Sequence, residues 1–361
     1  MRAAVLKSPK NLMLLDLPEP SSPPGGALIR VEACAVCGTD IKMLDQGHRD
    51  LQYPRILGHE VVGRIEEIDP EAKAGCPSEL KAGELVQLWP GIACGCCPAC
   101  LQGADNRCQK MRIIGFSCDG GFAERLALPR QSLSCSINPL PEGADPVLFT
   151  LTEPLACCVN GQEQARLSEG ESVLIWGGGP IGALHALLAE LKGAEKILVA
   201  ERLPGRIGEI RRNTSAQVID LSPDDRDGDG RDLFREAERT ILSETDGRGV
   251  DAILTATPEI KINQWQMSLL APGGRICIFS GPRPGDDAEM LDLRSMHYLE
   301  QTITGSYGCS SRHNRLAARL LLSGQIKADW IITKRTDLPR IEEAFAHSSR
   351  RAGFKSVVCF A

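Results

Sequence analysis

Four cysteines within one short segment constrain the fold of this chain more than any other feature. They are separated by two, two and seven residues, at Cys94, Cys97, Cys100 and Cys108. Four thiolates can close a tetrahedral site, which Zn2+ favours at Zn–S distances of roughly 2.3 Å. Such a site has no open position for a substrate, so it predicts a lobe held by a structural zinc ion and carries no catalytic meaning. Cys96 lies outside this spacing and is interpreted as a bystander, or as a substitute for a neighbouring ligand.

Disulfides and a cluster of buried thiols are the alternatives to zinc. Disulfides are rare in the cytosol, and residues 1–7 lack the apolar segment of a secretory signal. We therefore expect a cytoplasmic protein whose fifteen cysteines are metal ligands and small buried residues.

Length and charge restrict the class of protein further. A chain of 361 residues leads us to expect two domains. The formal charge of −6 gives no basic surface for nucleic acid, and the acidic run 224–230 is expected to be a solvated loop. No apolar stretch approaches the roughly 18 residues that span a membrane. Neither nucleic acid nor a membrane is expected as a partner.

The local pattern of the chain changes after about residue 150. Before it, proline and glycine interrupt short β-type runs such as 27–33 and 61–68, which predicts an irregular all-β lobe. From Ser172 onwards, apolar strands alternate with helical stretches after Pro180 and from Arg206. The expected strands are 172–176, 196–200, 250–254 and 274–279. This rhythm predicts an α/β domain with a doubly wound parallel sheet, followed by an amphipathic stretch over 314–322 and a last strand over 355–360.

A glycine-rich turn joins the first of these strands to the next helix. Glycines 177, 179 and 182, with Pro180 and Ile181 between them, satisfy G-x-G-x-x-G. Glycine is needed at the turn, where the backbone approaches pyrophosphate, and where helix meets strand. Because a strand precedes the motif and an apolar helix follows it, we expect Gly177, Gly179, Pro180, Ile181 and Gly182 to bind a dinucleotide.

Glu201 ends the next expected strand, 19 residues after Gly182. A carboxylate there accepts hydrogen bonds from ribose hydroxyls and repels a 2′-phosphate, which predicts NAD rather than NADP. Arg202 weakens this prediction, because a guanidinium attracts such a phosphate; an exposed or adenine-stacking role is favoured for it. Arg206 is expected as a second contact to the ribose.

A second set of ligand types lies apart from the four cysteines. It comprises Cys37 in Cys-Gly-Thr-Asp, His59 in Gly-His-Glu, and Glu153 in Glu-Pro-Leu. Mixed cysteine, histidine and carboxylate ligands leave Zn2+ a position for water or substrate, as a catalytic site requires. Spacing alone supports this site only moderately, since a single histidine is more often structural.

Taken in order, these motifs resemble the zinc-dependent medium-chain dehydrogenases/reductases, on the branch of the sorbitol (polyol) and threonine dehydrogenases. The resemblance spans nearly the whole chain. It implies a GroES-like, β-rich catalytic domain formed by 1–152 and 301–361, around a Rossmann NAD-binding domain at 153–300. It also implies two zinc ions per chain, NAD as cofactor, a small-molecule substrate and a homodimer or homotetramer.

The resemblance assigns roles to individual residues. Cys37, His59 and Glu60 are expected as zinc ligands, although simpler alcohol dehydrogenases keep the equivalent of Glu60 outside the metal's ligands. Glu153 stands where those enzymes have a third ligand, so either both carboxylates bind, directly or through water, or they exchange during turnover. Thr39 is expected to accept the hydroxyl proton.

Asp40 is expected to orient the imidazole of His59. Zinc would lower the pKa of a secondary alcohol, and the resulting alkoxide would transfer hydride to the nicotinamide.

Two departures from the family pattern stand out. Lys42 occupies the position of a histidine that relays the proton, and Gly308 replaces an arginine that binds sorbitol. These departures argue against sorbitol itself, and leave Lys42 as a relay, a binding cation or a solvent-facing side chain. Other residues could supply polar contacts to a different substrate, namely His48, Arg49, Tyr53, Arg312 and His313.

Three functional hypotheses follow. The favoured one is an NAD-dependent dehydrogenase of a polyol, cyclitol or sugar derivative. The second is a dehydrogenase of L-threonine, another amino alcohol or a simple secondary alcohol such as butanediol. The third is a non-catalytic scaffold that binds zinc and NAD, which the open metal site argues against.

Overall fold

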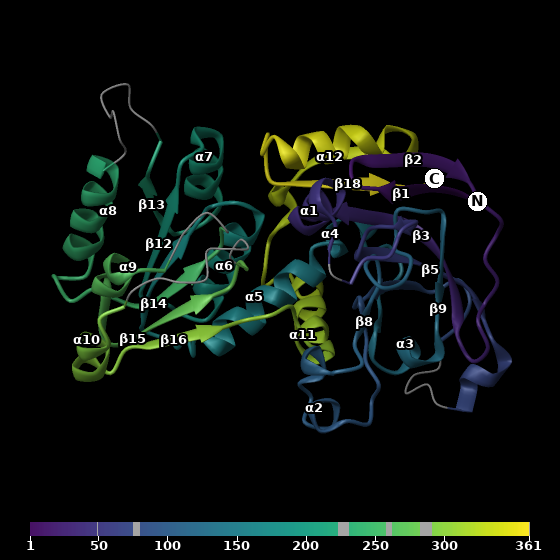
Figure 1. Ribbon diagram of the computed structural model, residues 1–361, viewed down its shortest axis with the longest axis horizontal. Helices are drawn as coiled ribbons and strands as arrows, with labels where there is room; N and C mark the ends of the chain where they lie inside the picture. The colour runs from purple at the N-terminus through teal and green to yellow at the C-terminus, as the bar shows by residue number, and fades with distance from the viewer. Residues whose placement is uncertain (49, 75–79, 223–230, 258–261, 282–290, 361) are drawn as a thin grey trace. The chain divides into compact units, whose positions relative to one another are not determined.

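The structure, a computed structural model, describes residues 1–48, 50–74, 80–222, 231–257, 262–281 and 291–360 (Figure 1). Arg49 and the acidic run 224–230 lie outside the described residues. The chain forms two compact units. The first contains residues 1–156, 309–324 and 328–361, and the second contains residues 157–308 and 325–327.

The first unit is built on a mixed seven-stranded sheet in the order β10-β6-β5-β3-β18-β17, with β9 also paired to β3. The strands are β3 (Ala27–Val36), β5 (Glu60–Ile68), β6 (Leu85–Leu88), β9 (Arg125–Leu128), β10 (Ile137–Pro139), β17 (Ile332–Asp337) and β18 (Lys355–Cys359). The long strand β3 is almost wholly buried and pairs antiparallel with β5 on one side and β18 on the other. The last strand of the chain therefore lies one strand away from β5.

Smaller elements surround this sheet. A three-stranded sheet contains β1 (Arg2–Ser8), β2 (Asn11–Asp16) and β4 (Arg55–Ile56), and a two-stranded one contains β7 (Gly91–Ile92) and β8 (Arg112–Ile113). The helices are α1 (Gly38–Gln46), α2 (Pro98–Leu101), α3 (Arg130–Cys135), α4 (Pro146–Phe149), α11 (Ser311–Leu322) and α12 (Ile341–Ser349). Short 3-10 turns are η1 (Pro70–Ala74), η2 (Asp105–Arg107), η3 (Asp329–Ile331) and η4 (Leu338–Arg340). Apolar residues from β1, β3, β5, β9 and α12 share one core.

The second unit contains a six-stranded parallel sheet in the order β13-β12-β11-β14-β15-β16 (Figure 1). Its strands are β11 (Ser172–Trp176), β12 (Lys196–Glu201), β13 (Gln217–Asp220), β14 (Val250–Thr255), β15 (Leu270–Ile278) and β16 (Thr302–Gly305). The helices are α6 (Pro180–Leu191), α7 (Pro204–Asn213), α8 (Arg231–Glu244), α9 (Gln264–Ser268) and α10 (Leu293–Leu299), while α5 (Thr152–Gln164) runs from the first unit into the second. Central strands such as β11 are buried along their whole length, as apolar runs in parallel sheets are. The expected doubly wound sheet is confirmed.

Hydrogen bonds link the N-terminal ends of two central strands, β11 and β14. Asp251 of β14 accepts hydrogen bonds from the backbone and hydroxyl of Ser172, at 2.8 and 2.7 Å, and from both terminal nitrogens of Arg248, at 2.7 and 2.9 Å. Burial raises the pKa of this carboxyl, but the hydrogen bonds from Arg248 and Ser172 outweigh it and lower the pKa to about 2.

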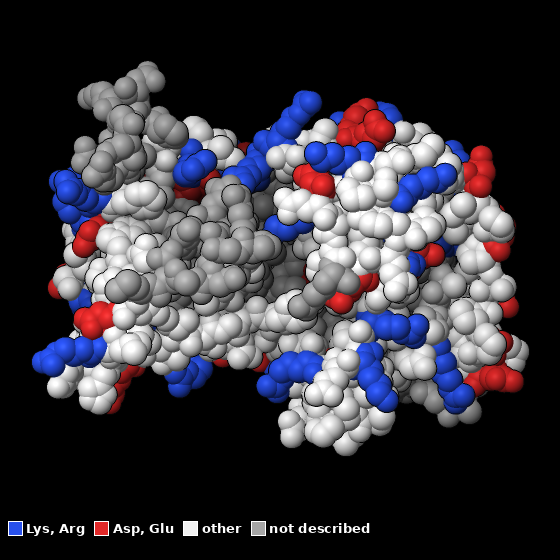
Figure 2. Space-filling model, in the orientation of Figure 1, with Lys and Arg blue, Asp and Glu red and all other residues white. Residues whose placement is uncertain are grey.

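Charges of both signs occur together on one face of the molecule (Figure 2). Figure 2 shows basic and acidic side chains interspersed on the face displayed. None of the helices within the described ranges is both long and apolar enough to cross a bilayer.

Candidate functional site

The four cysteines of the predicted metal lobe converge. The sulfur atoms of Cys94, Cys97, Cys100 and Cys108 all lie within 4.8 Å of one another. Cys97 and Cys100 are 3.4 Å apart and Cys94 and Cys100 are 3.9 Å apart, close to the roughly 3.8 Å edge of a tetrahedron of sulfurs around zinc. These separations far exceed a disulfide bond, and none of the cysteines in the described ranges forms a disulfide. The donor set fits a closed, four-thiolate zinc site.

Local backbone builds this lobe. Cys97 precedes α2, whose first residue is Pro98, and backbone N–H groups of Cys96 and Cys97 lower the pKa of Cys94 to about 6. A lowered pKa favours the thiolate, which is the form that binds metal. Cys96 is exposed and its sulfur lies 3.7 Å from that of Cys94, outside the set of four.

A second compact donor set forms between α1 and β5. The sulfur of Cys37, a ring nitrogen of His59 and a carboxylate oxygen of Glu60 lie within 4.8 Å of one another. Cys37 is the residue before α1. His59 follows Gly58, and Glu60 is the first residue of β5. Gly58 has a φ of +95°, and a Cβ there would lie 2.7 Å from the sulfur of Cys34. Only glycine therefore permits the turn that brings His59 and Glu60 next to Cys37.

Asp40 contacts two members of this set, Cys37 and His59. It is fully buried, accepts a 2.9 Å hydrogen bond from the Cys37 backbone on Oδ2, and has Oδ1 3.4 Å from Nδ1 of His59. Since Nδ1 faces Asp40, Nε2 of His59 is the nitrogen left for a metal. Burial lowers the pKa of His59, but the charges of Asp40 and Cys37 outweigh it and raise the pKa well above its usual value.

Lys355, which the sequence analysis did not identify as a site residue, pairs with Glu60. Its Nζ donates a 2.6 Å hydrogen bond to Oε1, and both side chains are buried, at 5% and 0% exposed. The other oxygen, Oε2, is buried and has no hydrogen-bond partner among the described residues. A buried, unpartnered carboxylate oxygen beside a thiol and an imidazole fits a divalent metal ion.

The pair also controls the protonation of Glu60. Burial raises the pKa of this carboxyl, Lys355 and His59 oppose the rise, and Glu153 adds to it, leaving a pKa of about 6. Burial lowers the pKa of Lys355, but Glu60 and Cys37 more than compensate and raise it above its usual value. The sequence contains one sign of this pair. Lys355 begins an otherwise apolar strand, and a lysine buried in such a strand needs a partner of opposite charge.

The remaining expected active-site residues occupy different positions. The hydroxyl of Thr39 is 3.7 Å from the sulfur of Cys37. Lys42 lies on α1 with an exposed side chain. Glu153, in the first turn of α5, acts on the pKa of Glu60 but is not part of the compact set. The roles assigned to these three residues stay predictions.

The polar residues considered as alternative substrate contacts separate into two groups. His48 is partly exposed and Tyr53 is exposed. The ring centroids of His48 and Phe116 are 5.4 Å apart. His313 is buried and caps α11, because its Nδ1 accepts from the backbone of Ser310 at 3.0 Å. Arg312 is exposed, with one terminal nitrogen 2.9 Å from Nε2 of His313.

The glycine motif of the second unit lies between β11 and α6. Gly177 has a φ of +105°, and a Cβ on Gly182 would lie 1.9 Å from the carbonyl oxygen of Gly177. Gly179 immediately precedes Pro180, the first residue of α6, with Ile181 in the same turn. A Cβ on Gly179 would lie 3.2 Å from a guanidinium nitrogen of Arg206. The loop thus offers bare backbone, a helix N-terminus and a nearby cation, which fits a pyrophosphate.

Glu201 is held rigidly at the end of β12. Oε2 accepts a 2.9 Å hydrogen bond from the Gly178 backbone, and Oε1 accepts from the backbones of Arg202 and Leu203 at 2.6 and 2.9 Å. The side chain is 7% exposed, whereas Arg202 is exposed. The carboxylate is therefore fixed beside the glycine loop.

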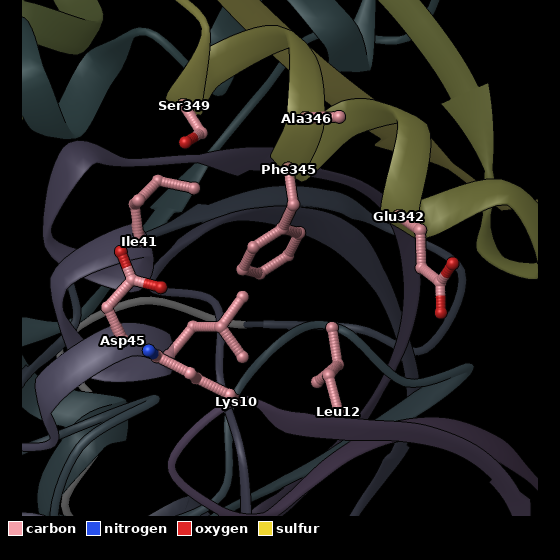
Figure 3. A pocket seen from close by; sticks show the side chains of 9 residues that line it. Lys10, Leu12, Ile41, Asp45, Glu342, Phe345, Ala346 and Ser349 are labelled. Carbon is pink, nitrogen blue, oxygen red and sulfur yellow. The ribbon is translucent and has the colours of Figure 1, made fainter.

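The described residues also line a cavity elsewhere in the first unit (Figure 3). It lies between α1 and α12, has a volume of about 300 Å³, and is lined by Lys10, Leu12, Ile41, Leu44, Asp45, Glu342, Phe345, Ala346 and Ser349. It contains none of the expected site residues.

Comparison with known proteins places this geometry in a family. Residues 23–138 match the alcohol dehydrogenase GroES-like domain. L-galactonate-5-dehydrogenase of Escherichia coli K12 is 30% identical, with 100% of this chain and 99% of that protein covered. The chain belongs to the zinc-dependent medium-chain dehydrogenase/reductase family.

Two further comparisons support the same family. L-threonine 3-dehydrogenase of Pyrococcus horikoshii is 31% identical over 97% of this dehydrogenase and 94% of its own length. The crystal structure of a zinc-binding dehydrogenase from Sinorhizobium meliloti 1021, bound to NADP, superposes with a TM-score of 0.84 at 28% identity and 99% coverage of both chains. The expected fold, with a GroES-like domain and a Rossmann-like parallel sheet, is confirmed. This dehydrogenase is an alcohol oxidoreductase that uses zinc, a nicotinamide cofactor and a small-molecule substrate.

Proposed function

We propose that this dehydrogenase oxidises a secondary hydroxyl of a polyol, cyclitol or sugar derivative in the cytoplasm, with NAD as hydride acceptor and two zinc ions per chain. The compact set of Cys37, His59 and Glu60 carries the proposal. Three donors of different type leave a fourth position on zinc for the substrate oxygen, whereas the four-cysteine lobe leaves none.

A zinc ion in this set would supply the Lewis acidity that lowers the pKa of an alcohol hydroxyl, and the nicotinamide would accept the hydride. Thr39 would accept the proton of the substrate hydroxyl on the oxygen that lies 3.7 Å from the Cys37 sulfur, and would pass its own hydroxyl proton to solvent or to Lys42. Asp40 keeps His59 in the tautomer and orientation in which Nε2 binds metal. Lys355 holds one oxygen of Glu60 and leaves the other for the metal.

Two residues have finer roles in this proposal. Glu153 would supply a further carboxylate ligand to the metal, because it lies near enough to raise the pKa of Glu60 but outside the compact set. Lys42, exposed on α1, either passes the proton onward or binds oxygen-rich groups of the ligands. A relay role requires its pKa to fall when the ligands are bound, because a free lysine is protonated at neutral pH.

Polyol and sugar-acid substrates are favoured by the relatives. The Escherichia coli relative is a dehydrogenase of L-galactonate, a polyhydroxylated acid, and it covers the whole of this chain. A second candidate, oxidation of L-threonine, is favoured by the Pyrococcus relative of similar identity.

NAD is proposed over NADP because of Glu201. Its carboxylate is buried and cannot swing away, since three backbone N–H groups hold it. A 2′-phosphate there would meet like charge in a partly desolvated pocket. The Sinorhizobium structure contains NADP, so the cofactor preference of this enzyme has to be measured directly.

A homodimer or homotetramer is proposed, and the edge of the parallel sheet offers one surface for this assembly. Strand β16 pairs only with β15 within the described ranges, and such an open edge can pair with a second copy. Leu293 and Tyr298 on the preceding helix α10 are 73% and 69% exposed. Light scattering of the purified enzyme tests this assembly.

A substrate panel tests the function. Hexitols, cyclitols, aldonates, L-threonine and 2,3-butanediol are each supplied with NAD or NADP, and reduction is followed in the absorbance band of the reduced cofactor. We expect the largest kcat/KM for a polyhydroxylated substrate with NAD. A largest value for L-threonine would select the second candidate, and elemental analysis showing a single zinc ion per active chain would contradict the two-site assignment.

A further inference from the structure

His48 lies beside the metal-binding set but is separated from it by an aromatic ring. The Phe116 ring makes an edge-to-face contact with His59, with centroids 5.2 Å apart, and another with His48, at 5.4 Å. Phe116 is buried, at 8% exposed, whereas the side chain of His48 is 29% exposed. One imidazole therefore belongs to the metal-binding set, and the other faces solvent across the same phenyl ring.

The turn after α1 fixes His48 in place. Gly47 ends the helix with a φ of +77°, and the backbone of Leu51 donates a 3.0 Å hydrogen bond to the carbonyl of His48. The hydroxyl of Tyr53 lies against Gly47, where a Cβ would be only 2.8 Å from it. The backbone and one side chain thus restrict the position of this turn.

The turn also places two groups of Asp50 against Nδ1 of His48. The backbone N–H of Asp50 donates to Nδ1 at 3.2 Å, and Oδ2 of Asp50 lies 3.6 Å from the same nitrogen. With Nδ1 as the acceptor, or with the ring protonated beside that carboxylate, Nε2 carries a proton. Nε2 has no hydrogen-bond partner among the described residues. The structure therefore presents an oriented N–H donor one phenyl ring away from the metal ligand His59.

We infer that His48 is a substrate-binding residue that donates a hydrogen bond from Nε2 to an oxygen of the substrate remote from the reacting carbon. This inference rests on the proposed function and narrows its substrate class. The phenyl ring lies between the two imidazoles, so the donor lies beyond the side chain that contacts His59 and is remote from the metal-binding set. A simple alcohol has only the reacting oxygen, whereas a six-carbon polyol or aldonate carries further hydroxyl or carboxylate oxygens that can accept from this donor.

The apolar ring between the two histidines supports this division of roles. Phe116 keeps His48 out of the ligand set, so His48 does not compete for zinc. A hydroxyl or a carboxylate oxygen of the substrate provides the same acceptor chemistry for the Nε2 proton. A carboxylate makes the stronger hydrogen bond, because charge-assisted bonds exceed neutral ones.

Two substitutions at this position test the inference. His48→Phe retains an aromatic ring against Phe116 but has no donor, whereas His48→Gln retains an N–H donor. Each variant and the wild type are assayed with galactitol, L-galactonate and 2-butanol. We expect His48→Phe to lower kcat/KM for the six-carbon substrates about tenfold or more, mainly through KM, because a hydrogen bond worth about 1.4 kcal/mol is lost.

The same variant should change kcat/KM for 2-butanol by less than about twofold, because that substrate has no second oxygen to accept from the donor. His48→Gln should recover most of the loss with the six-carbon substrates. Zinc content should be unchanged in both variants. In the enzyme–NADH complex, the rise in Tm caused by the preferred six-carbon substrate should be smaller for His48→Phe than for the wild type.

The two possible acceptors give different results. A larger loss for L-galactonate than for galactitol identifies a carboxylate acceptor, and an equal loss identifies a hydroxyl. Equal losses for the six-carbon substrates and 2-butanol, or no loss with either, would overturn the role of His48 while leaving the proposed function intact. A wild type that oxidises 2-butanol but neither six-carbon substrate would overturn the proposed polyol function itself.

Discussion

Replacing Lys355 by methionine should reveal how strongly the metal-binding set depends on a buried cation. The ammonium lies 2.6 Å from Oε1 of Glu60, and the two side chains are 5% and 0% exposed. Removing one partner of a buried ion pair costs about 3–5 kcal/mol, because the other charge is left in a low-dielectric interior. Methionine fills a similar volume, so cavity formation adds little to this cost.

Two further variants separate charge from packing. Lys355→Met combined with Glu60→Gln leaves no uncompensated carboxylate, so the double variant should be at least about 2 kcal/mol more stable than additivity of the single changes predicts. Lys334→Met is the matched control on the neighbouring strand. Lys334 pairs with Glu343 at 2.8 Å, but the side chains are 35% and 48% exposed, so its loss should cost less than about 1 kcal/mol.

Thermal and denaturant unfolding measure these differences, with zinc present and after chelation. The cost of Lys355→Met should be smaller with zinc bound, because the zinc ion then compensates the charge of Glu60 in place of the lysine. The reasoning fails if Lys355→Met costs no more than Lys334→Met, or if the double variant is additive. It also fails if chelation leaves the cost unchanged, since Glu60 would then be independent of the metal.

Five other single substitutions have expected outcomes. Cys97→Ser should impair folding and lose one zinc ion per chain. His59→Ala should lose the other zinc ion and the activity, but NAD should still raise its Tm. Elemental analysis and thermal unfolding check both variants. Glu201→Ala should narrow a preference for NAD over NADP that exceeds about tenfold in the wild type, as measured by kcat/KM. The pKa of Asp251 is about 2 in the folded protein and roughly 3.9 in the unfolded chain. Its contribution to the free energy of unfolding is therefore present above pH 4 and is lost as the pH falls towards 2. Asp251→Asn should remove roughly 2 kcal/mol of this pH dependence, as measured by unfolding in acid. Lys42→Ala should lower kcat, with partial rescue by an external amine, if the lysine relays a proton, or raise KM if it binds ligand.

Local patterns predicted most of the second unit. The expected strand 172–176 is β11 to the residue, and 196–200 differs from β12 by one residue, because apolar runs buried on both faces of a parallel sheet have clear ends. Strand β15 starts at Leu270, four residues before the expectation, since Pro272 and two glycines hide its beginning. The four cysteines were also recognisable, because all four donors lie in one short segment.

Contacts between distant segments could not be predicted in this way. Glu60 and Lys355 are 295 residues apart in sequence, and nothing near either residue indicates the other. The pairing arises because β18 lies beside β3 and β3 lies beside β5, an order that follows from the whole sheet. The contact of His48 with Phe116 has the same origin, since only the folded chain brings the turn after α1 to the segment before β9.

The position of Lys355 gives the last strand a direct part in the metal site. Because Lys355 holds Oε1 of Glu60, the unpartnered oxygen Oε2 is already oriented before a metal arrives, and less side-chain freedom is lost on binding. The pairing of β18 with β3 fixes the lysine in turn, through backbone hydrogen bonds beginning at Ser356 opposite Val36, the residue before Cys37. Strands β3, β5 and β18 therefore connect the thiolate, the carboxylate and the cation in one sheet, so disruption of the C-terminal strand should weaken metal binding without altering any ligand.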